Sequence, residues 1–206
     1  MGAPLKLKHT QADPVRLSFP DLFTPTLFTG ETDPKKKRYN AAFIVAPGGT
    51  NAAAIDAAIL AAATEAFEGN VAKATAFINA HKGNSNKYCY VSGDTKTYDG
   101  YAGNMVLSAH RPVSQGKPGI FDCTRAGPDG KPAPLVEEDG KPYAGCYVNA
   151  SLEIWIQKSP ATQAGVRCSM SGVFFANDGD HFAGGKTASG DEFNVSDGAD
   201  AGDDLA

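Results

Sequence analysis

The sequence predicts a mainly β fold with one helical insertion. Glycine and proline are frequent, at 23 and 13 of 206 residues, which favours many short strands joined by turns over a helical bundle. Apolar residues make up 42% of the chain, an ordinary share for a folded domain. A helical spacing of apolar residues is confined to about residues 50–82. The length suits one sizeable core rather than two full domains.

The first segments of the chain predict an arm followed by two strands. Residues 1–15 are polar and contain prolines, so we expect a flexible N-terminal arm. Residues 16–28 alternate aromatic residues with prolines and predict an irregular, edge-like or bulged strand, because proline cannot donate to a sheet. Residues 39–45 predict a second strand, which a Pro-Gly-Gly turn at 47–49 closes.

The alanine-rich segment that follows predicts the helical insertion. Thr50 or Asn51 suits the N-cap of a helix. Apolar residues then recur every four positions and form one stripe: Ile55, Ile59, Ala63 and Phe67. A Gly-Asn pair at 69–70 interrupts the helix, and a second, shorter helix is predicted over 71–81.

From residue 87 onward the pattern is again strand and turn. Strands are predicted at 88–91, 104–112, 120–122, 146–156 and 165–175. Residues 126–141 hold three prolines and three glycines among charged residues, which indicates a long loop or hairpin tip. Strands, one helical excursion and more strands fit a Greek-key barrel, of which the OB-fold is the commonest small kind. We therefore expect an OB-fold-like domain over residues 16–190.

The net charge of −4 conceals an asymmetry along the chain. Residues 191–206 carry six acids and no base: Asp191, Glu192, Asp197, Asp200, Asp203 and Asp204. Without them 19 basic and 17 acidic residues remain, so the body is slightly positive. A disordered acidic tail is predicted, which can occupy a cationic groove weakly until nucleic acid displaces it. The alternative is a tail that only keeps the protein soluble.

The strand over 146–156 has two different faces. One face is apolar throughout and predicts the core side: Val148, Ala150, Leu152, Ile154 and Ile156. The other carries Tyr147 and Trp155 among polar residues. Aromatic rings on a solvent-facing sheet suit base stacking, because every base offers a π-face. The alternative is that the helices or residues 126–141 cover these two rings.

A basic cluster precedes the strand over 39–45. It consists of Lys35, Lys36, Lys37 and Arg38, directly before Tyr39. Lysine and arginine follow a phosphate backbone, although an isolated charge run is more often a solvated loop. The other candidates for stacking or phosphate contact are Tyr88, Tyr90, Tyr98, Tyr101, Arg111, Arg125 and Arg167.

Other classes of function find no support in the sequence. The four cysteines and four histidines lack metal-site spacing, so we expect reduced, buried thiols, no metal and no cofactor. No GxSxG, HExxH or strand-linked GxGxxG motif occurs, and we expect a protein without catalytic residues. There is no secretory signal and no apolar stretch of membrane-spanning length, which indicates a soluble intracellular protein without membrane partners.

Four segments together resemble the bacteriophage single-stranded-DNA-binding proteins of the Enc type. They are RLSFPDLFTP at 16–25, YAGNMVLSAHRP at 101–112, PYAGCYVNASLEIW at 142–155 and DGDHFAGG at 178–185. The resemblance covers most of residues 14–195. It implies an OB-fold that coats and protects single strands independently of base sequence, in phage DNA replication or recombination in the cytoplasm of the infected bacterial host.

The resemblance also implies partners for the tail. Its acids Asp197, Asp200, Asp203 and Asp204 would meet replication or recombination proteins. One departure concerns the end of the chain, which is Leu205-Ala206, whereas many such tails end in an aromatic residue. Preference for DNA over RNA stays open, and a monomer or weak homo-oligomer is expected. The alternative function is a structural virion protein, such as a decoration or tail component.

Overall fold

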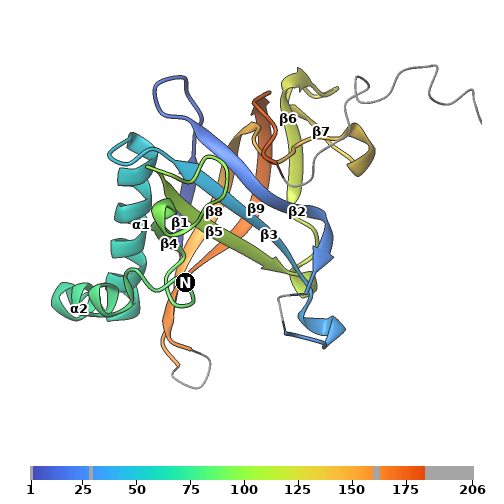
Figure 1. The fold of residues 1–206 in the computed structure, drawn as a ribbon. Coiled ribbons are helices and arrows are strands. Elements are labelled where there is room, and N and C mark those ends of the chain that lie inside the picture. Colours follow the sequence, from blue (N-terminus) through green and yellow to red (C-terminus); the bar gives the residue numbers. More distant parts are fainter. Residues whose placement is uncertain (1, 28–29, 160–162, 184–206) are drawn as a thin grey trace, which may run out of the picture.

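Five strands of the computed structural model close into a barrel (Figure 1). The structure describes residues 2–27, 30–159 and 163–183. The strands are β2 (Val15–Thr26), β3 (Arg38–Val45), β5 (Met105–Pro112), β8 (Tyr147–Gln157) and β9 (Gly165–Asn177). Their neighbour order is β2-β3-β5-β9-β8, and β8 returns to β2 where Tyr147 pairs with Arg16. All pairs are antiparallel except β5–β9. In chain order this is 1-2-3-5-4, the connectivity of the OB-fold, and it confirms the predicted fold class.

Four more strands extend this barrel. β1 (Ala3–Leu7) pairs with β8, and β4 (Tyr90–Ser92) pairs with β5. β6 (Gly119–Ala126) runs parallel to β9, and β7 (Pro132–Pro134) pairs with β6. Short 3-10 turns lie at Pro34–Lys36, Gly93–Thr95, Val113–Gln115 and Glu137–Asp139. The predicted loop or hairpin tip over 126–141 therefore contains β7 and one such turn.

The N-terminal segment differs from the flexible arm that we expected. Residues 3–7 form β1, with Leu5 paired opposite Leu152 of β8. Leu5 and Leu7 are buried in the core, while Lys6 between them is exposed. This alternation is the period of a half-buried strand, but it is too short to stand out in a polar segment. The predicted acidic tail over 191–206 lies outside the described residues.

Both predicted helices are present between β3 and β5. They are α1 (Thr50–Ala66) and α2 (Val71–His81), and they lie to one side of the barrel (Figure 1). Ile55, Ile59 and Ala63 of the predicted stripe are buried, and Phe67 ends α1 and packs on Phe77, with ring centroids 5.3 Å apart.

The start of α1 is held differently from the prediction. Its N-cap is Gly49, which has no side chain to offer. The buried carboxylate of Asp13 instead accepts hydrogen bonds from the Thr50 hydroxyl at 2.5 Å and the Asn51 amide at 2.7 Å. A residue far away in the sequence thus supplies the cap, because the segment before β2 passes over the helix terminus.

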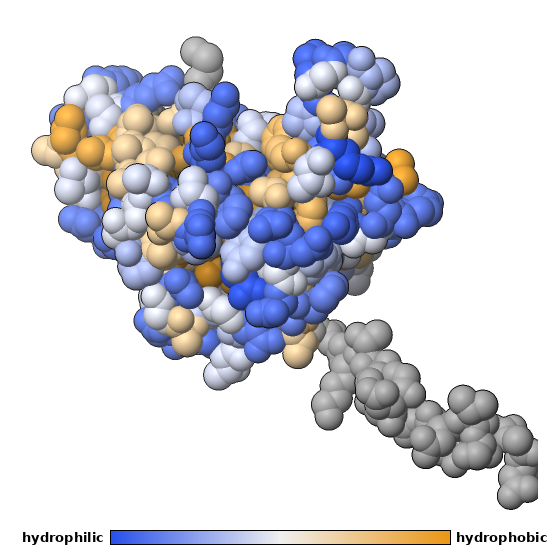
Figure 2. All heavy atoms as spheres, turned by 90° about the horizontal axis from the view of Figure 1, so that it is seen from above, coloured by the Kyte–Doolittle hydropathy of each residue, from blue (hydrophilic) through white to orange (hydrophobic). Residues whose placement is uncertain are grey.

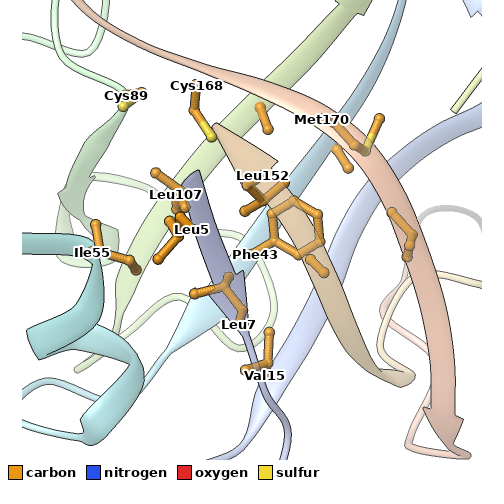
Figure 3. Packing of buried hydrophobic residues seen from close by; sticks show 14 of the residues in the cluster. Leu5, Leu7, Val15, Phe43, Ile55, Cys89, Leu107, Leu152, Cys168 and Met170 are labelled. Atoms are coloured by element: carbon orange, nitrogen blue, oxygen red, sulfur yellow. The ribbon is translucent and has the colours of Figure 1, made fainter. Parts of the chain in front are cut away.

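The barrel encloses one large apolar core. Phe43 of β3 lies among side chains from β1, β5, β8 and β9 (Figure 3). Val148, Ala150, Leu152 and Ile154 are buried as predicted, while Ile156 is only partly so. Cys89, Cys146 and Cys168 are buried free thiols, and burial raises the pKa of Cys89 and Cys146 to about 12. Cys123, on the β6–β7 hairpin, is exposed and does not fit that prediction.

Candidate nucleic-acid interface

The outer face of β3 and β5 carries the side chains that alternate with the core residues. On β3 these are Arg38, Asn40, Ala42 and Ile44, and on β5 they are Val106, Ser108 and His110. Register places Asn40 beside His110, Ala42 beside Ser108 and Ile44 beside Val106. The Ile44 end is covered by Tyr101 and Phe182 in a small second apolar cluster. The opposite end of this outer face is polar and more open, so a ligand can lie at that end.

Two depressions join over this face. One, of about 330 Å³, lies over Asn40 and Ala42 and is walled by Phe19, Tyr98 and Tyr101. The other, of about 620 Å³, extends towards Trp155, Gln157 and Arg167. They share four lining residues, Arg38, Ser85, Ser108 and His110. The two depressions therefore form one continuous groove, called the groove below.

The aromatic end of the groove presents two half-exposed rings. Phe19 of β2 is 52% exposed and Tyr98 is 50% exposed. Their ring centroids lie 4.9 Å apart in an edge-to-face arrangement, and the buried ring of Tyr101 lies 5.3 Å from that of Tyr98. Few other large apolar side chains are this exposed in the described residues, and Figure 2 shows a face of the molecule on which hydrophobic patches lie among hydrophilic residues. Exposed rings at a groove suit base stacking.

The cationic end contains two guanidinium groups around a histidine. Arg167 is fixed by hydrogen bonds to the Gln157 side chain at 3.1 Å and to the carbonyls of Asn86 at 2.6 Å and Gln163 at 2.8 Å. Burial, with the nearby charges of Arg38 and Arg167, lowers the pKa of His110 to about 4. His110 is therefore a neutral ring between two cations at neutral pH, a combination that suits a base flanked by phosphates.

Trp155 and Tyr147, both on the outer face of β8, do not lie together. Trp155 lines the groove and donates its indole N–H to the Ser169 hydroxyl at 2.9 Å. Tyr147 lies eight residues away, about 26 Å along an extended strand. Its ring stacks on His9, with centroids 4.6 Å apart, and Arg16 lies over it at 5.4 Å. Of this predicted pair, the groove contains only Trp155.

Several predicted stacking residues lie in the core. Tyr39, Tyr88 and Tyr90 are buried in the main apolar cluster, and burial raises the pKa of Tyr90 to about 12. Tyr39 and Tyr90 occupy inward positions of β3 and β4, and Tyr88 lies just before β4, so all three rings belong to the core and none lines the groove. Tyr101 is also buried, but it contributes to the groove wall.

The predicted cations are similarly divided. Lys35, Lys36 and Lys37 are exposed between β2 and β3, next to the Arg38 end of the groove, and Lys36 pairs with Glu31 at 2.6 Å. Arg111 instead donates to the backbone carbonyls of Gln115 at 2.6 Å, Gly116 at 2.8 Å and Met170 at 3.3 Å, which ties down the turn after β5. Arg125 binds Asp122 at 2.9 Å and does not line the groove.

The groove is also lined by residues that were not among the candidates, and they include Phe19, Asn40, Ser108 and His110. For Asn40, Ser108 and His110, a signal was present, since each alternates with apolar residues in its strand. For Phe19 the only signal was its position before Pro20, where we expected an irregular strand.

Residues 2–27, 30–159 and 163–183, which the structure describes, contain no candidate metal site and no candidate membrane-spanning helix. Within these ranges, no group of three or more His, Cys, Asp or Glu residues is arranged to hold a metal ion. No helix there is both long and apolar enough to span a membrane.

Comparisons with known proteins give a family match over most of the chain and a similar phage protein. The family described as "Enterobacter phage Enc34, ssDNA-binding protein" matches residues 8–205. "Putative protein p50" of Acyrthosiphon pisum secondary endosymbiont phage 1 is 38% identical over 181 residues, which cover 87% of this chain and 89% of that protein.

Solved structures show the same fold at lower identity. The single-stranded DNA-binding protein of bacteriophage Enc34, in complex with ssDNA, has a TM-score of 0.62 at 17% identity and covers 87% of this chain and 89% of its own. Gp2.5 of bacteriophage T7, a single-stranded DNA binding protein, has a TM-score of 0.52 at 13% identity over 100% of both chains.

Proposed function

We infer, from the fact that this chain belongs to the family of the Enterobacter phage Enc34 ssDNA-binding protein, that it binds single-stranded DNA in phage DNA replication. The family match favours this function over a structural virion protein, the alternative that the sequence left open. We further propose where the strand lies, how it is recognised and what the tail does.

We propose that the groove is where the strand lies. The observation that carries this is a continuous depression on the outer face of β3 and β5, with half-exposed rings at one end, Arg167 at the other and Arg38 where the two depressions join. In OB-folds the face of the second and third strands and the adjoining loops bind oligonucleotides. Here these strands are β3 and β5, and the adjoining loops contain Lys35, Lys36 and Lys37 and join β8 to β9.

Recognition in this groove is independent of base sequence. Arg38, Arg167 and the exposed lysines attract phosphates, whose position does not depend on the base. Four rings offer flat surfaces to bases, and stacking tolerates any base: Phe19, Tyr98, Trp155 and neutral His110. Asn40 and Ser108 between them supply small polar groups along the floor. The protein acts by binding, not catalysis: it coats and protects single strands in the host cytoplasm during replication and recombination.

The acidic tail is proposed to regulate this groove. Ala183, the last described residue, donates its amide to the Asp99 carboxylate at 2.7 Å, and Phe182 packs near Tyr101. The last described residue therefore lies near the aromatic end of the groove. From there six acids can reach the cations until a strand displaces them and frees the tail for replication or recombination proteins.

Fluorescence titration tests the proposed groove directly. Trp155 is the single tryptophan and lines the groove, so its emission reports on occupancy. Oligo-dT should change this emission saturably at low salt, with an affinity that falls steeply as salt rises, and mixed-sequence strands should bind equally well. If oligo-dT binds without a change in Trp155 emission, the strand lies elsewhere on the protein. The same titration with oligo-U would establish the preference for DNA over RNA.

A further inference from the structure

Phe19 has a backbone conformation that is unusual for its residue type. Its φ is +48°, in the left-handed region that phenylalanine rarely adopts, and the following residue is Pro20, which restricts it further. Such conformations cost of order 1–3 kcal/mol and persist only where the surroundings enforce them. The strain at Phe19 therefore calls for a physical reason.

A β-bulge enforces this conformation. Ser18 pairs with Ala42 and Asp21 pairs with Asn40, so Phe19 and Pro20 together stand opposite the single residue Ala41. Both flanks are tied down. Ser18 is buried and hydrogen-bonded to Tyr101, and the Asp21 carboxylate accepts from Thr26 at 2.7 Å and from Asn40 at 3.3 Å.

The bulge reverses the direction of the Phe19 side chain. Val15 and Leu17 point into the core, and strict alternation along β2 would turn residue 19 inward as well. Instead the ring is 52% exposed at the groove, and the next side chain of β2 that is buried in the core is that of Leu22. Bulges re-aim side chains next to functional sites, whereas burial of this ring would have stabilised the fold.

Tyr98 faces this ring from a different part of the chain. The two rings form the edge-to-face pair 4.9 Å apart, and both line a second depression, with Pro20, Ala144 and Phe182, in addition to the groove. A ring pair that borders two depressions has space into which the rings can separate to admit a flat group. Since both rings are already half-exposed, little apolar contact is lost when they separate.

We propose that Phe19 and Tyr98 form a clasp that admits one nucleobase between their rings, and that the left-handed backbone of Phe19 exists to hold its ring in this position. The proposal rests on the proposed function and adds to it a specific base site. The clasp marks the aromatic end of the strand's path, whereas the guanidinium groups bind phosphates at the other end.

Substitutions at Phe19 distinguish the contribution of the ring to binding from the contribution of the backbone conformation to stability. Phe19→Gly removes the ring and suits the left-handed conformation, so the thermal unfolding midpoint should stay equal or rise. Affinity for oligo-dT should fall roughly tenfold, which corresponds to the loss of one stacked base. Phe19→Trp keeps a stacking ring and should bind within about twofold of the wild type. Tyr98→Leu, at a position without backbone strain, should weaken binding as Phe19→Gly does.

Three controls make the test specific. Val136→Ala alters a side chain that is 54% exposed and lies outside the groove, and it should change nothing. The dependence of affinity on salt should be the same in Phe19→Gly as in the wild type, because no phosphate contact is lost. The double variant with Tyr98→Leu should bind no more weakly than the weaker single variant, since both rings hold the same base.

The outcomes distinguish this inference from the proposed function. Salt-dependent binding by the wild type, with equal affinity in Phe19→Gly, would overturn the clasp and leave the proposed function standing. A lower unfolding midpoint in Phe19→Gly would overturn the claim that the backbone is strained. If the wild type itself binds no single strand at low salt, the proposed function fails, and the clasp fails with it.

Discussion

Arg38 lies where the two depressions of the groove join and Arg167 lies at one end, and the two come from strands far apart in the sequence. If each holds one phosphate, Arg38→Gln or Arg167→Gln should weaken binding and reduce the slope of log affinity against log salt by about 0.7, the value for one contact with a single strand. Oligo-dT titrations at several salt concentrations measure this slope.

Arg111 provides the matched control for these variants. Its guanidinium donates to three backbone carbonyls and does not line the groove, so Arg111→Gln should lower the unfolding midpoint and leave the salt slope unchanged. An unchanged slope in both groove variants would show that the phosphates lie elsewhere.

His110 makes stability depend on pH. Its pKa is lowered from 6.5 to about 4 in the folded protein, which means that folding favours the neutral ring. Its contribution to stability is therefore complete above pH 6.5 and is lost as the pH falls towards 4, by about 3 kcal/mol in all.

Urea unfolding at pH 7.5 and 4.5 tests this dependence. The free energy of unfolding of the wild type should fall more between these two values than that of His110→Gln, which cannot take up the proton. Equal losses in the two proteins would mean that His110 is accessible to water and titrates normally. Arg38 and Arg167 remain charged throughout this range.

At the scale of elements, β1 adds a strand to the barrel beside β8. Leu7 is 1% exposed, so Leu7→Ala should lower the free energy of unfolding by about 2–5 kcal/mol, through lost burial and a cavity. Lys6→Ala, at the neighbouring exposed position, should stay within about 0.5 kcal/mol of the wild type. Chemical denaturation measures both, and a negligible effect at Leu7 would mean that the N-terminal segment detaches readily.

The irregular strand β2 illustrates how an element serves the site. Its prolines predicted a break in regular pairing, and the structure has register shifts between Ser18 and Asp21 and between Asp21 and Thr26. A regular strand would have buried Phe19. The irregularity costs stability locally but gives the groove its aromatic end.

At the scale of the whole molecule, charge is divided between body and tail. The whole chain has a net charge of −4. Without residues 191–206 it has 19 basic and 17 acidic residues, so its net charge becomes slightly positive. The truncated protein should bind oligo-dT more tightly at low salt, and the difference should shrink as salt screens the tail. Equal or weaker binding after truncation would mean that the tail does not compete for the groove.

The sequence by itself determined most elements of this protein, although not β1 or β7. Proline and glycine placed the turns, the spacing of Ile55, Ile59 and Ala63 predicted a helix, and alternation over 146–156 identified the buried face of β8. These are local patterns with periods of two or 3.6 residues, so short windows of sequence contain them. Four segments, read together, were enough to indicate the family.

Only the tertiary structure decided which side chains form the groove. Arg38, His110 and Arg167 come together through the pairing of β3, β5 and β9, which no local pattern encodes. Tyr39 and Tyr90 resembled stacking residues, but their strands turn them into the core, while the bulge turns Phe19 out. The reason is that the direction of a side chain depends on strand register, and a shift of one residue reverses it.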